Sequence, residues 1–323
     1  MDDLRHQLVD VNGVSLHVVT AGASDGPPVV LCHGFPETWY SWRHQLTALG
    51  DAGFRAVAFD WRGYGQSSVP RSVDAYGTDR LCADLGALLD HFGYDQAAFV
   101  GHDWGAMVLW DMARMHPERV GSLFNMSVPL SQAPGPPLEF FETLFADQFF
   151  YINYFQEIGV AEAELESSTR RFVRDFLYSA SGEGMASGRA FTPAPREGTG
   201  LLDTLANAPD PLPSWMSEHD VDVYCEAFDN SGFFGPLNFY RNMDDNWRRT
   251  HDVPASNISM PVGFLTGSLD PVRLLTSGAA EAMADVLGDS RGVTVLDGAG
   301  HWIQQERPAE VNAALLGFLG EVS

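Results

Sequence analysis

The sequence predicts an α/β fold, in which a mostly parallel sheet is flanked by helices and interrupted by an inserted helical cap. From Val14 to Val128, short apolar runs alternate with helical patterns, and the alternation returns after Pro261. Such alternation is typical of a parallel sheet covered by helices on both faces. Between Pro129 and Pro261, helical patterns, proline-rich loops and many aromatic residues take its place. We therefore expect a core domain in two parts, residues 1–129 and 261–323, and a cap domain over residues 130–260.

The strands of the first part are expected where apolar runs end at turn signals. Residues 14–19 alternate like a half-buried strand, whereas residues 28–32 and 55–60 are continuous apolar runs typical of buried strands. Further apolar runs at 97–100 and 122–128 complete the set. Together they predict neighbouring strands of one sheet.

Helices are expected between these strands. The spacing predicts one over residues 39–49 and another over residues 78–92, whose leucines fall on one face. Thr78 is placed to cap the second helix, and Gly93 to end it. A third helix, after the next strand, stops near Pro117.

The insertion and the last part of the chain have their own signals. Residues 161–178 are strongly helical, and residues 182–213 are so rich in glycine, proline and alanine that a long loop is expected. Strands are expected again at 262–266 and 293–296. A closing helix begins at Pro308, since proline is favoured at the first helical position.

Composition limits the classes of function. The 323 residues, 45% of them hydrophobic, can bury one large core, or one core plus a lid. With 43 acidic and 19 basic residues, the formal charge of -24 repels phosphate backbones and anionic lipids, so nucleic-acid and membrane-surface partners are excluded. The three cysteines are far apart and indicate free thiols. Because the first residues lack a basic segment before an apolar one, and no apolar run approaches membrane-spanning length, we expect a cytoplasmic protein.

A turn between a strand and a helix is the feature around which we expect the chain to be organised. An apolar run ends in Gly101-His102-Asp103-Trp104-Gly105, and a helical pattern starts at once, which is typical of a nucleophile elbow. Asp103 lies at its apex. A carboxylate that attacks an acyl carbon gives a labile anhydride, whereas attack on an alkyl carbon gives a stable ester that water can cleave later. The electrophile is therefore expected to be a saturated carbon.

Two segments after the insertion complete a catalytic set. Asp270 follows the strand expected at 262–266, and His301 lies in the loop after the strand expected at 293–296. The chain order nucleophile, acid, histidine is that of the hydrolases built on such elbows. Asp103 is thus the expected nucleophile, His301 the general base that activates water, and Asp270 the residue that orients His301.

These motifs together resemble the soluble-type epoxide hydrolases of the α/β-hydrolase fold. The resemblance extends over nearly the whole chain, including two segments of the cap. It rests on residues 33–36 (HGFP), 62–65 (RGYG), 101–105 (GHDWG), 150–157 (FYINYFQE), 235–243 (GPLNFYRNM) and 300–302 (GHW). It implies a hydrolase acting on ether bonds, which converts an epoxide and water to a vicinal diol through a covalent aspartyl ester.

The resemblance implies two phenols in the cap that donate to the epoxide oxygen. By position they are Tyr151 and Tyr240, with Tyr154 as the local competitor of Tyr151. Opening an epoxide leaves an alkoxide, which is too basic to depart without a donor, and phenols supply one.

The same resemblance implies that the backbone amides of Phe35 and Trp104 form an oxyanion hole. It also implies a cis peptide bond between Phe35 and Pro36. A substrate pocket is expected to be lined by Phe35, Pro36, Trp104, Tyr154 and Trp302. His33 and His102 are expected to serve in structural hydrogen bonding, with no metal and no cofactor.

Two other functions stay open. A haloalkane dehalogenase uses the same aspartyl ester, but a halide needs N–H donors rather than phenols. A non-catalytic ligand receptor of this fold can lose triad members or tyrosines, yet none is missing here. The aromatic-rich cap suits a small apolar epoxide, with water as the second substrate. A homodimer follows from the resemblance alone, and the role can be detoxification or biosynthesis.

Overall fold

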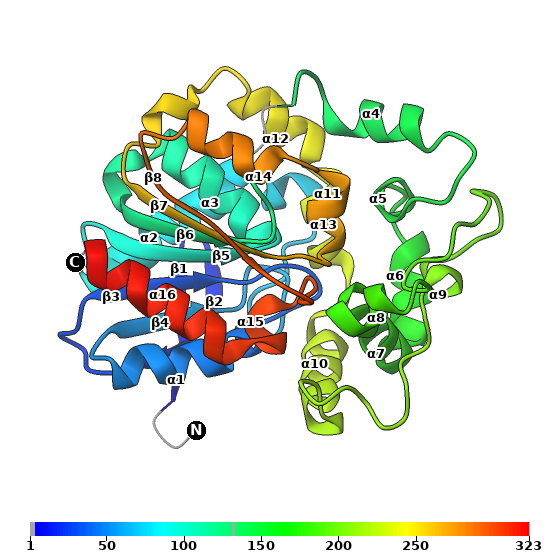
Figure 1. Cartoon of the computed structure of the whole chain (residues 1–323), viewed down its shortest axis with the longest axis horizontal. Coiled ribbons are helices and arrows are strands. Elements are labelled where there is room, and N and C mark those ends of the chain that lie inside the picture. The colour runs from blue at the N-terminus through cyan, green and yellow to red at the C-terminus, as the bar shows by residue number, and fades with distance from the viewer. Residues whose placement is uncertain (1–3, 131–132, 323) are drawn as a thin grey trace.

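The computed structural model describes residues 4–130 and 133–322, and within them the chain forms an eight-stranded sheet covered by helices (Figure 1). The strand order is β1-β2-β4-β3-β5-β6-β7-β8. The strands are β1 (Arg5–Val11), β2 (Val14–Ala21), β3 (Pro28–Cys32), β4 (Arg55–Phe59), β5 (Ala97–His102), β6 (Val120–Met126), β7 (Pro261–Gly267) and β8 (Asp289–Leu296). From β4 to β8 neighbouring strands are parallel, while β2 pairs antiparallel with both β1 and β4. The prediction of a mostly parallel sheet is confirmed.

The edge strand β1 is the one strand that the sequence patterns did not predict. Most of its side chains are exposed, and Leu8 is 64% exposed. It is held by its register with β2, in which Leu8 lies opposite His17. An edge strand with little buried surface shows no regular apolar alternation, so its pairing partner alone defines it.

Helices cover both faces of the sheet because successive strand residues point to opposite sides. Val29 and Leu31 of β3 pack in the cluster that contains Leu46 of α1 and Leu315 of α16, whereas Val30 packs in the cluster of α2 and α3. The helices of the core are η1 (Trp39–Trp42), α1 (Arg43–Asp51), η2 (Val73–Tyr76), α2 (Thr78–Phe92), α3 (Trp104–Met115), η3 (Pro117–Arg119), α13 (Pro271–Leu275), α14 (Ala279–Ala282), η5 (Met283–Asp285), α15 (Ile303–Glu306) and α16 (Pro308–Val322).

The start of α2 differs from the prediction. Thr78 does not cap this helix; Gly77 occupies the N-cap position, and the Thr78 hydroxyl donates to Asp111 at 2.8 Å. The Thr78 amide donates instead to Asn246 of the neighbouring helix at 2.8 Å, so a tertiary contact satisfies the helix end. The predicted end at Gly93 is confirmed, since this residue has φ 76° and so adopts the left-handed conformation.

The segment between β6 and β7, called the cap below, is helical. It contains α4 (Pro137–Leu144), α5 (Tyr151–Tyr154), α6 (Val160–Ser167), α7 (Thr169–Ala180), α8 (Gly182–Ala186), α9 (Leu201–Thr204), α10 (Glu218–Ser231), α11 (Phe234–Arg241), α12 (Met243–Thr250) and η4 (Ala255–Asn257). Figure 1 shows α5 to α10 grouped beside the core, past the end of the sheet where α13 and α15 begin. The division into core and cap at residues 129/130 and 260/261 stays a prediction.

Two expectations within the cap need correction. The helix expected over 161–178 is two helices, because Ser168 leaves the helical conformation with φ -145°. The region expected to be a long loop, residues 182–213, contains α8 and α9 and pairs with other cap residues through bridges such as Gln148 with Pro195. Tertiary pairing orders a segment whose composition alone indicates a loop. No described helix is both long and apolar enough to cross a bilayer.

Candidate active site

Asp103 lies at the sharp turn between β5 and α3. Its φ of 52° is unusual for a residue with a side chain. The turn needs the glycines on either side, because a Cβ at Gly105 would lie 2.0 Å from the Cys32 carbonyl oxygen, and one at Gly101 would lie 2.6 Å from the Asn125 side chain. The strand, turn and helix expected here are therefore present, with the carboxylate at the apex.

The Asp103 carboxylate is held from two directions. The Phe35 amide donates to Oδ1 at 2.8 Å, and Nε2 of His301 lies 3.4 Å from Oδ2. The side chain is 15% exposed, so it can still meet a substrate. Burial opposes its charge, but His301 and the Phe35 amide outweigh burial and hold the pKa of Asp103 below its usual value. Asp103 is thus a carboxylate at neutral pH, as a nucleophile must be.

His301 connects Asp103 to the second carboxylate. Nδ1 of His301 donates to Oδ1 of Asp270 at 3.0 Å, and the other oxygen of Asp270 accepts from the Ser127 hydroxyl. Burial disfavours the imidazolium, but Asp270 and Asp103 raise the pKa of His301 well above its usual value. Asp270 also caps α13 by accepting the Val272 amide, so its carboxylate is fixed in orientation.

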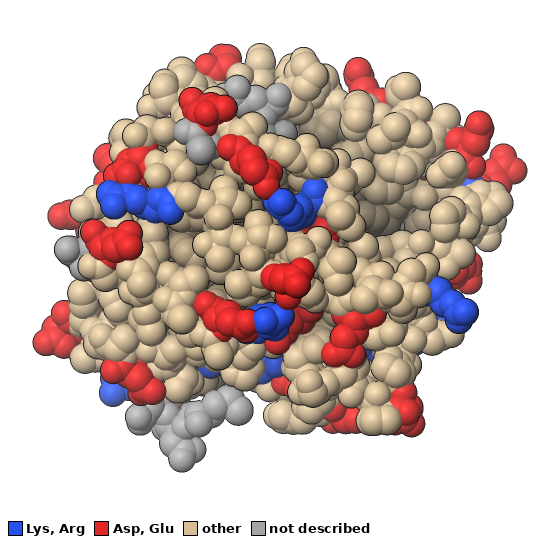
Figure 2. Space-filling model, in the orientation of Figure 1, with Lys and Arg blue, Asp and Glu red and all other residues tan. Residues whose placement is uncertain are grey.

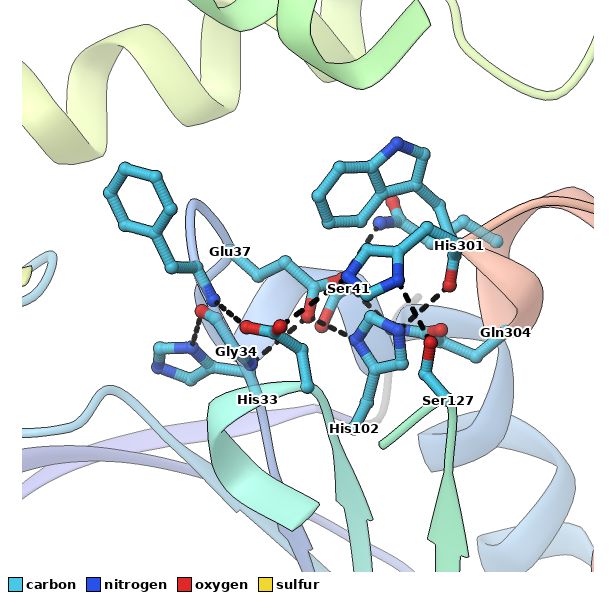
Figure 3. Close-up of polar contacts among 12 residues, drawn as sticks. His33, Gly34, Glu37, Ser41, His102, Ser127, His301 and Gln304 are labelled. Carbon is cyan, nitrogen blue, oxygen red and sulfur yellow. Dashed lines mark hydrogen bonds and ion pairs between the residues drawn. The ribbon is translucent and has the colours of Figure 1, made fainter. Parts of the chain in front are cut away.

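Ser127 is a site residue that the sequence reasoning did not single out. It follows β6, has φ 71°, and places its hydroxyl oxygen 2.8 Å from Nδ1 of His301 (Figure 3). The usable signal was its place just beyond the carboxyl end of a strand adjacent to both β5 and β7. Within the apolar run assigned to 122–128, one serine did not stand out.

Behind Asp103 and His301 lies a buried network around Glu37, which Figure 3 shows beside the rings of His102 and His301, whose centres are 4.8 Å apart. Oε2 of Glu37 accepts from the Gly34 amide at 3.0 Å and lies 2.8 Å from Nδ1 of His102. Nε2 of His102 donates to the backbone carbonyl of His301 at 2.8 Å. Gln304 donates to Oε1 of Glu37. One carboxylate therefore links the loop of the Phe35 amide to the loop of the catalytic histidine.

Charge and burial in this network follow the same pattern as at Asp103. Glu37 and His102 are both fully buried. Burial opposes ionisation of Glu37, yet His102 and the Gly34 amide lower the pKa of the Glu37 carboxyl. The sequence analysis expected structural hydrogen bonding for His102 but did not identify Glu37 as its partner.

The two predicted phenols lie together across from Asp103. The rings of Tyr151 and Tyr240 are 5.9 Å apart, and Tyr240 also contacts Trp104 at 4.9 Å and Phe35 at 5.5 Å between ring centres. Burial raises the pKa of both phenols, and the negative charge of Asp103 raises each further. Both phenols therefore keep their protons and can donate. Figure 2 shows the surface hollowed where α5 lies across from α13.

The remaining predicted residues take different places. The Phe35 to Pro36 peptide bond is cis, as the resemblance implied. Tyr154 is not brought to the group; its hydroxyl donates to Glu164 at 2.8 Å, and it lines a separate cavity of about 430 Å³. Trp302 is fully buried, and its indole donates to the Leu177 carbonyl of α7. Pocket roles for these residues, and the Trp104 amide as second oxyanion donor, stay predictions.

No metal centre emerges from the part of the chain that the structure describes, where no three His, Cys, Asp or Glu side chains are grouped to hold an ion. Nδ1 of His33 donates to the Gly34 carbonyl, and its Nε2 accepts the Trp61 amide at 3.2 Å. Both ring nitrogens of this buried histidine are thus engaged in hydrogen bonds that shape the loop before Phe35.

Comparison with known proteins agrees with this geometry. The chain matches the family described as alpha/beta hydrolase fold over residues 27–308. It is 46% identical over 316 residues to Epoxide hydrolase A of Mycobacterium tuberculosis (strain ATCC 25618 / H37Rv), which covers 97% of this chain and 96% of that protein.

Solved structures show the same likeness. Epoxide Hydrolase A from Mycobacterium thermoresistibile superposes with a TM-score of 0.89 at 46% identity, covering 98% of each chain. An epoxide hydrolase from an endophytic Streptomyces superposes with a TM-score of 0.92 at 38% identity, covering 100% of this chain and 97% of that one. The chain therefore belongs to the α/β-hydrolase fold family, and within it to the epoxide hydrolases.

Proposed function

We propose that this protein converts a small apolar epoxide and water to a vicinal diol through an ester formed on Asp103. One observation carries the proposal. The Phe35 amide donates to the Asp103 carboxylate, and His301 lies beside it. The negative charge of Asp103 also raises the pKa of two protonated phenols, Tyr151 and Tyr240. These contacts support Asp103 as a nucleophile with a base and two acids nearby.

Ring opening is the first step. An oxygen of Asp103 attacks one epoxide carbon, the bond between that carbon and the epoxide oxygen breaks, and the departing oxygen takes a proton from Tyr151 or Tyr240. General-acid assistance of this kind contributes about 10² to 10⁴ in rate. Because burial raises the pKa of both phenols, each still carries its proton when substrate binds.

Ester cleavage is the second step, and it requires neutral His301. In the free enzyme Asp270 and Asp103 raise the pKa of His301, so the ring is charged. When Asp103 becomes an ester, one of these two negative charges disappears and the pKa of His301 falls. The ring can then release its proton, which replaces the one lost by the phenol.

Neutral His301 takes a proton from water as the water oxygen attacks the ester carbonyl carbon. The amide of Phe35 stabilises the charge that develops on the carbonyl oxygen, and loss of one such donor typically costs about 10² to 10³ in rate. The bond between the carbonyl carbon and the alkyl oxygen breaks, the alkyl oxygen takes the second proton of the attacking water, and the diol leaves. The Asp103 carboxylate and protonated His301 return.

The nearest alternative is a haloalkane dehalogenase. Its ester chemistry would use Asp103 and His301 in the same way, but a halide leaves without a proton and gains nothing from two phenols. The pair of buried, protonated tyrosines therefore favours the epoxide. A panel of terminal, aryl and internal epoxides beside matched haloalkanes, scored for diol and for halide, separates the two. Halide release without diol formation would reverse the assignment.

The ester itself is tested by a single turnover in ¹⁸O-labelled water. Label should enter the Asp103 carboxylate when the ester is cleaved, and the first diol released should carry none from water. Diol labelled directly, with unlabelled Asp103, would exclude the covalent path. Intact-protein mass spectrometry should detect a stable adduct on His301→Gln and none on Asp103→Ala.

A cytoplasmic location, a homodimer and a role in detoxification or in biosynthesis stay predictions from the sequence. The thiols of Cys32, Cys82 and Cys225 are free, and unpaired cysteines accord with a reducing compartment.

A further inference from the structure

Two short helices of the cap carry the two phenols. A side chain at the end of α11 contacts the backbone just past α5, and a side chain just past α5 contacts the backbone of α11. Tyr151 is the first residue of α5, and Tyr240 is the residue before last of α11. The spacing between the phenols depends on how these two helices are joined. A helix of four residues such as α5 has little stability of its own, so tertiary contacts must hold it.

Arg241, directly after Tyr240, crosses from α11 to the end of α5. Its Nε donates to the Phe155 carbonyl at 2.8 Å, and its Nη2 donates to the Glu157 carbonyl at 3.4 Å. Carbonyls at a helix C-terminus lack partners within the helix and carry partial negative charge, so a guanidinium suits them. Nη1 donates back to the Asn238 side chain at 3.0 Å, which fixes the guanidinium on α11.

Gln156 makes the reverse connection. Its Nε2 donates to the Ile152 carbonyl of α5 at 2.8 Å and to the Tyr240 carbonyl of α11 at 3.5 Å. Arg241, the residue after Tyr240, thus binds backbone carbonyls just past α5. Gln156, which lies just past α5, binds the backbone carbonyl of Tyr240. The two contacts restrain α5 and α11 against sliding in either direction.

Glu162 completes the arrangement from a third helix. One of its oxygens forms an ion pair with Arg241 at 2.8 Å, and the two side chains are only 9% and 4% exposed. Its other oxygen accepts the Gly159 amide at 2.8 Å, which anchors it in the first turn of α6. A buried charge pair held at both ends tolerates little displacement, because either charge left alone in this site would be costly.

We propose that Arg241 is a positioning residue for ring opening, which sets the separation of Tyr151 and Tyr240 by joining α5 to α11. The inference rests on the proposed function, since it assigns Arg241 to the step that the phenols assist. All its contacts named above lie in the cap, whereas His301, Asp270 and Phe35, which serve ester cleavage, belong to the core. Loss of Arg241 therefore slows ester formation and leaves ester cleavage unchanged.

The test is a single-turnover measurement with an aryl epoxide, styrene oxide, that resolves ester formation from ester cleavage. Arg241→Met should lower the rate of ester formation by about 10-fold to 100-fold, since a displacement near 1 Å can cost about 10²-fold. The rate of ester cleavage should stay within about twofold of the wild-type rate, because the residues that serve this step belong to the core and keep their positions. Arg241→Lys should recover part of the loss, because it keeps the charge opposite Glu162 but not the planar fork of donors. Gln156→Leu should lower the same step by a smaller factor.

A matched control is Arg170→Met. Arg170 pairs with Asp222 and Glu218 on the cap surface and is 49% exposed, so both steps should keep their wild-type rates. Equal slowing of both steps in Arg241→Met would indicate general loss of structure and overturn the positioning role, as would wild-type ester formation in a folded variant. If Arg241→Met does not fold, the ratio of the ester-formation rate to the ester-cleavage rate in Arg241→Lys and Gln156→Leu decides. A wild-type protein that forms no ester would instead refute the proposed function.

Discussion

Nε2 of His301 lies 3.4 Å from Oδ2 of Asp103, so base and nucleophile form an ion pair in the free protein. The pair explains why the pKa values of these two neighbouring groups shift in opposite directions. Burial disfavours both charges, but each charge favours the other, so the pKa of Asp103 is lowered and the pKa of His301 is raised. On the proposed mechanism, the pairing that keeps Asp103 ionised also keeps His301 protonated until the ester forms.

This ion pair predicts a specific dependence of stability on pH. The raised pKa of His301 contributes stability fully below its ordinary value of 6.5, and the contribution is lost as pH rises through the folded-state pKa. The lowered pKa of Asp103 contributes fully above its ordinary value of 3.8 and is lost as pH falls through the folded-state pKa.

The pair should therefore stabilise most between these two ordinary values. Melting temperatures of the wild type and His301→Gln, measured from about pH 4 to about pH 10, should differ most at about pH 5 to 6 and converge toward the alkaline end. A difference that is constant over this range would mean that the charge of His301 does not contribute.

The phenols predict a second result. Tyr240→Phe removes one donor and leaves the ring that packs on Trp104 and Phe35. Ester formation should fall by about 10²-fold, while ester cleavage stays unchanged. Rapid-quench single turnovers measure both. Tyr154→Phe is the matched control, because that hydroxyl is bound to Glu164, away from the site, and should leave ester formation at the wild-type rate. If Tyr154→Phe slowed ester formation and Tyr240→Phe did not, Tyr154 would be the donor.

Glu37→Gln tests the buried network. Both oxygens of Glu37 accept hydrogen bonds, from the Gly34 amide on one side and from Gln304 and Gln305 on the other. In the glutamine, an amide nitrogen replaces one of these oxygens and cannot accept the hydrogen bond that the donor beside it offers. The free energy of unfolding should therefore fall by about 1 to 3 kcal/mol. Ester cleavage should slow as the Phe35 loop shifts.

Urea denaturation and single turnovers measure the two effects of Glu37→Gln. Glu310→Gln is the control, because its pair with Arg307 is exposed to solvent and its loss should change stability far less than the loss at Glu37. Equal losses in the two variants would show that the network at Glu37 is not specifically required.

Substitution of glycine by alanine should have opposite effects at Gly105, in the elbow, and at Gly86, within α2. Gly105→Ala would put a Cβ 2.0 Å from the Cys32 carbonyl, a backbone atom that cannot move aside, so soluble folded protein should be lost. Gly86→Ala, within α2 and with nothing within 4 Å of the added Cβ, should stabilise by about 0.5 to 1 kcal/mol. Yield and thermal melts compare them, and a folded, active Gly105→Ala would refute the close approach.

Patterns along the chain predicted the parts of this protein that short segments specify. Buried strands such as β3 are continuous apolar runs, and the turn at Asp103 needs glycines at fixed positions, so both can be read from a few residues. The chain order of Asp103, Asp270 and His301 placed each at a strand end, and the ends of parallel strands meet at one edge. The structure brings these three together.

Other expectations were wrong where a distant partner decides the local structure. Thr78 does not cap α2, since Asn246 from the cap satisfies the helix end. The strand β1 exists because β2 pairs with it, and residues 182–213 are held in part by the bridge between Pro195 and Gln148. The residues adjacent in sequence show no pattern that predicts such distant partners.

Patterns over a few residues suffice to predict the class of fold and the elbow and to propose Asp103, Asp270 and His301 as site residues, because backbone limits and apolar periodicity act locally. The contacts of Ser127 with His301, of Glu37 with His102, and of Arg241 with the Phe155 carbonyl become visible only in the folded chain. Those contacts link residues that are far apart in the chain. Their energies come from burial and charge in the folded state, which no local pattern contains.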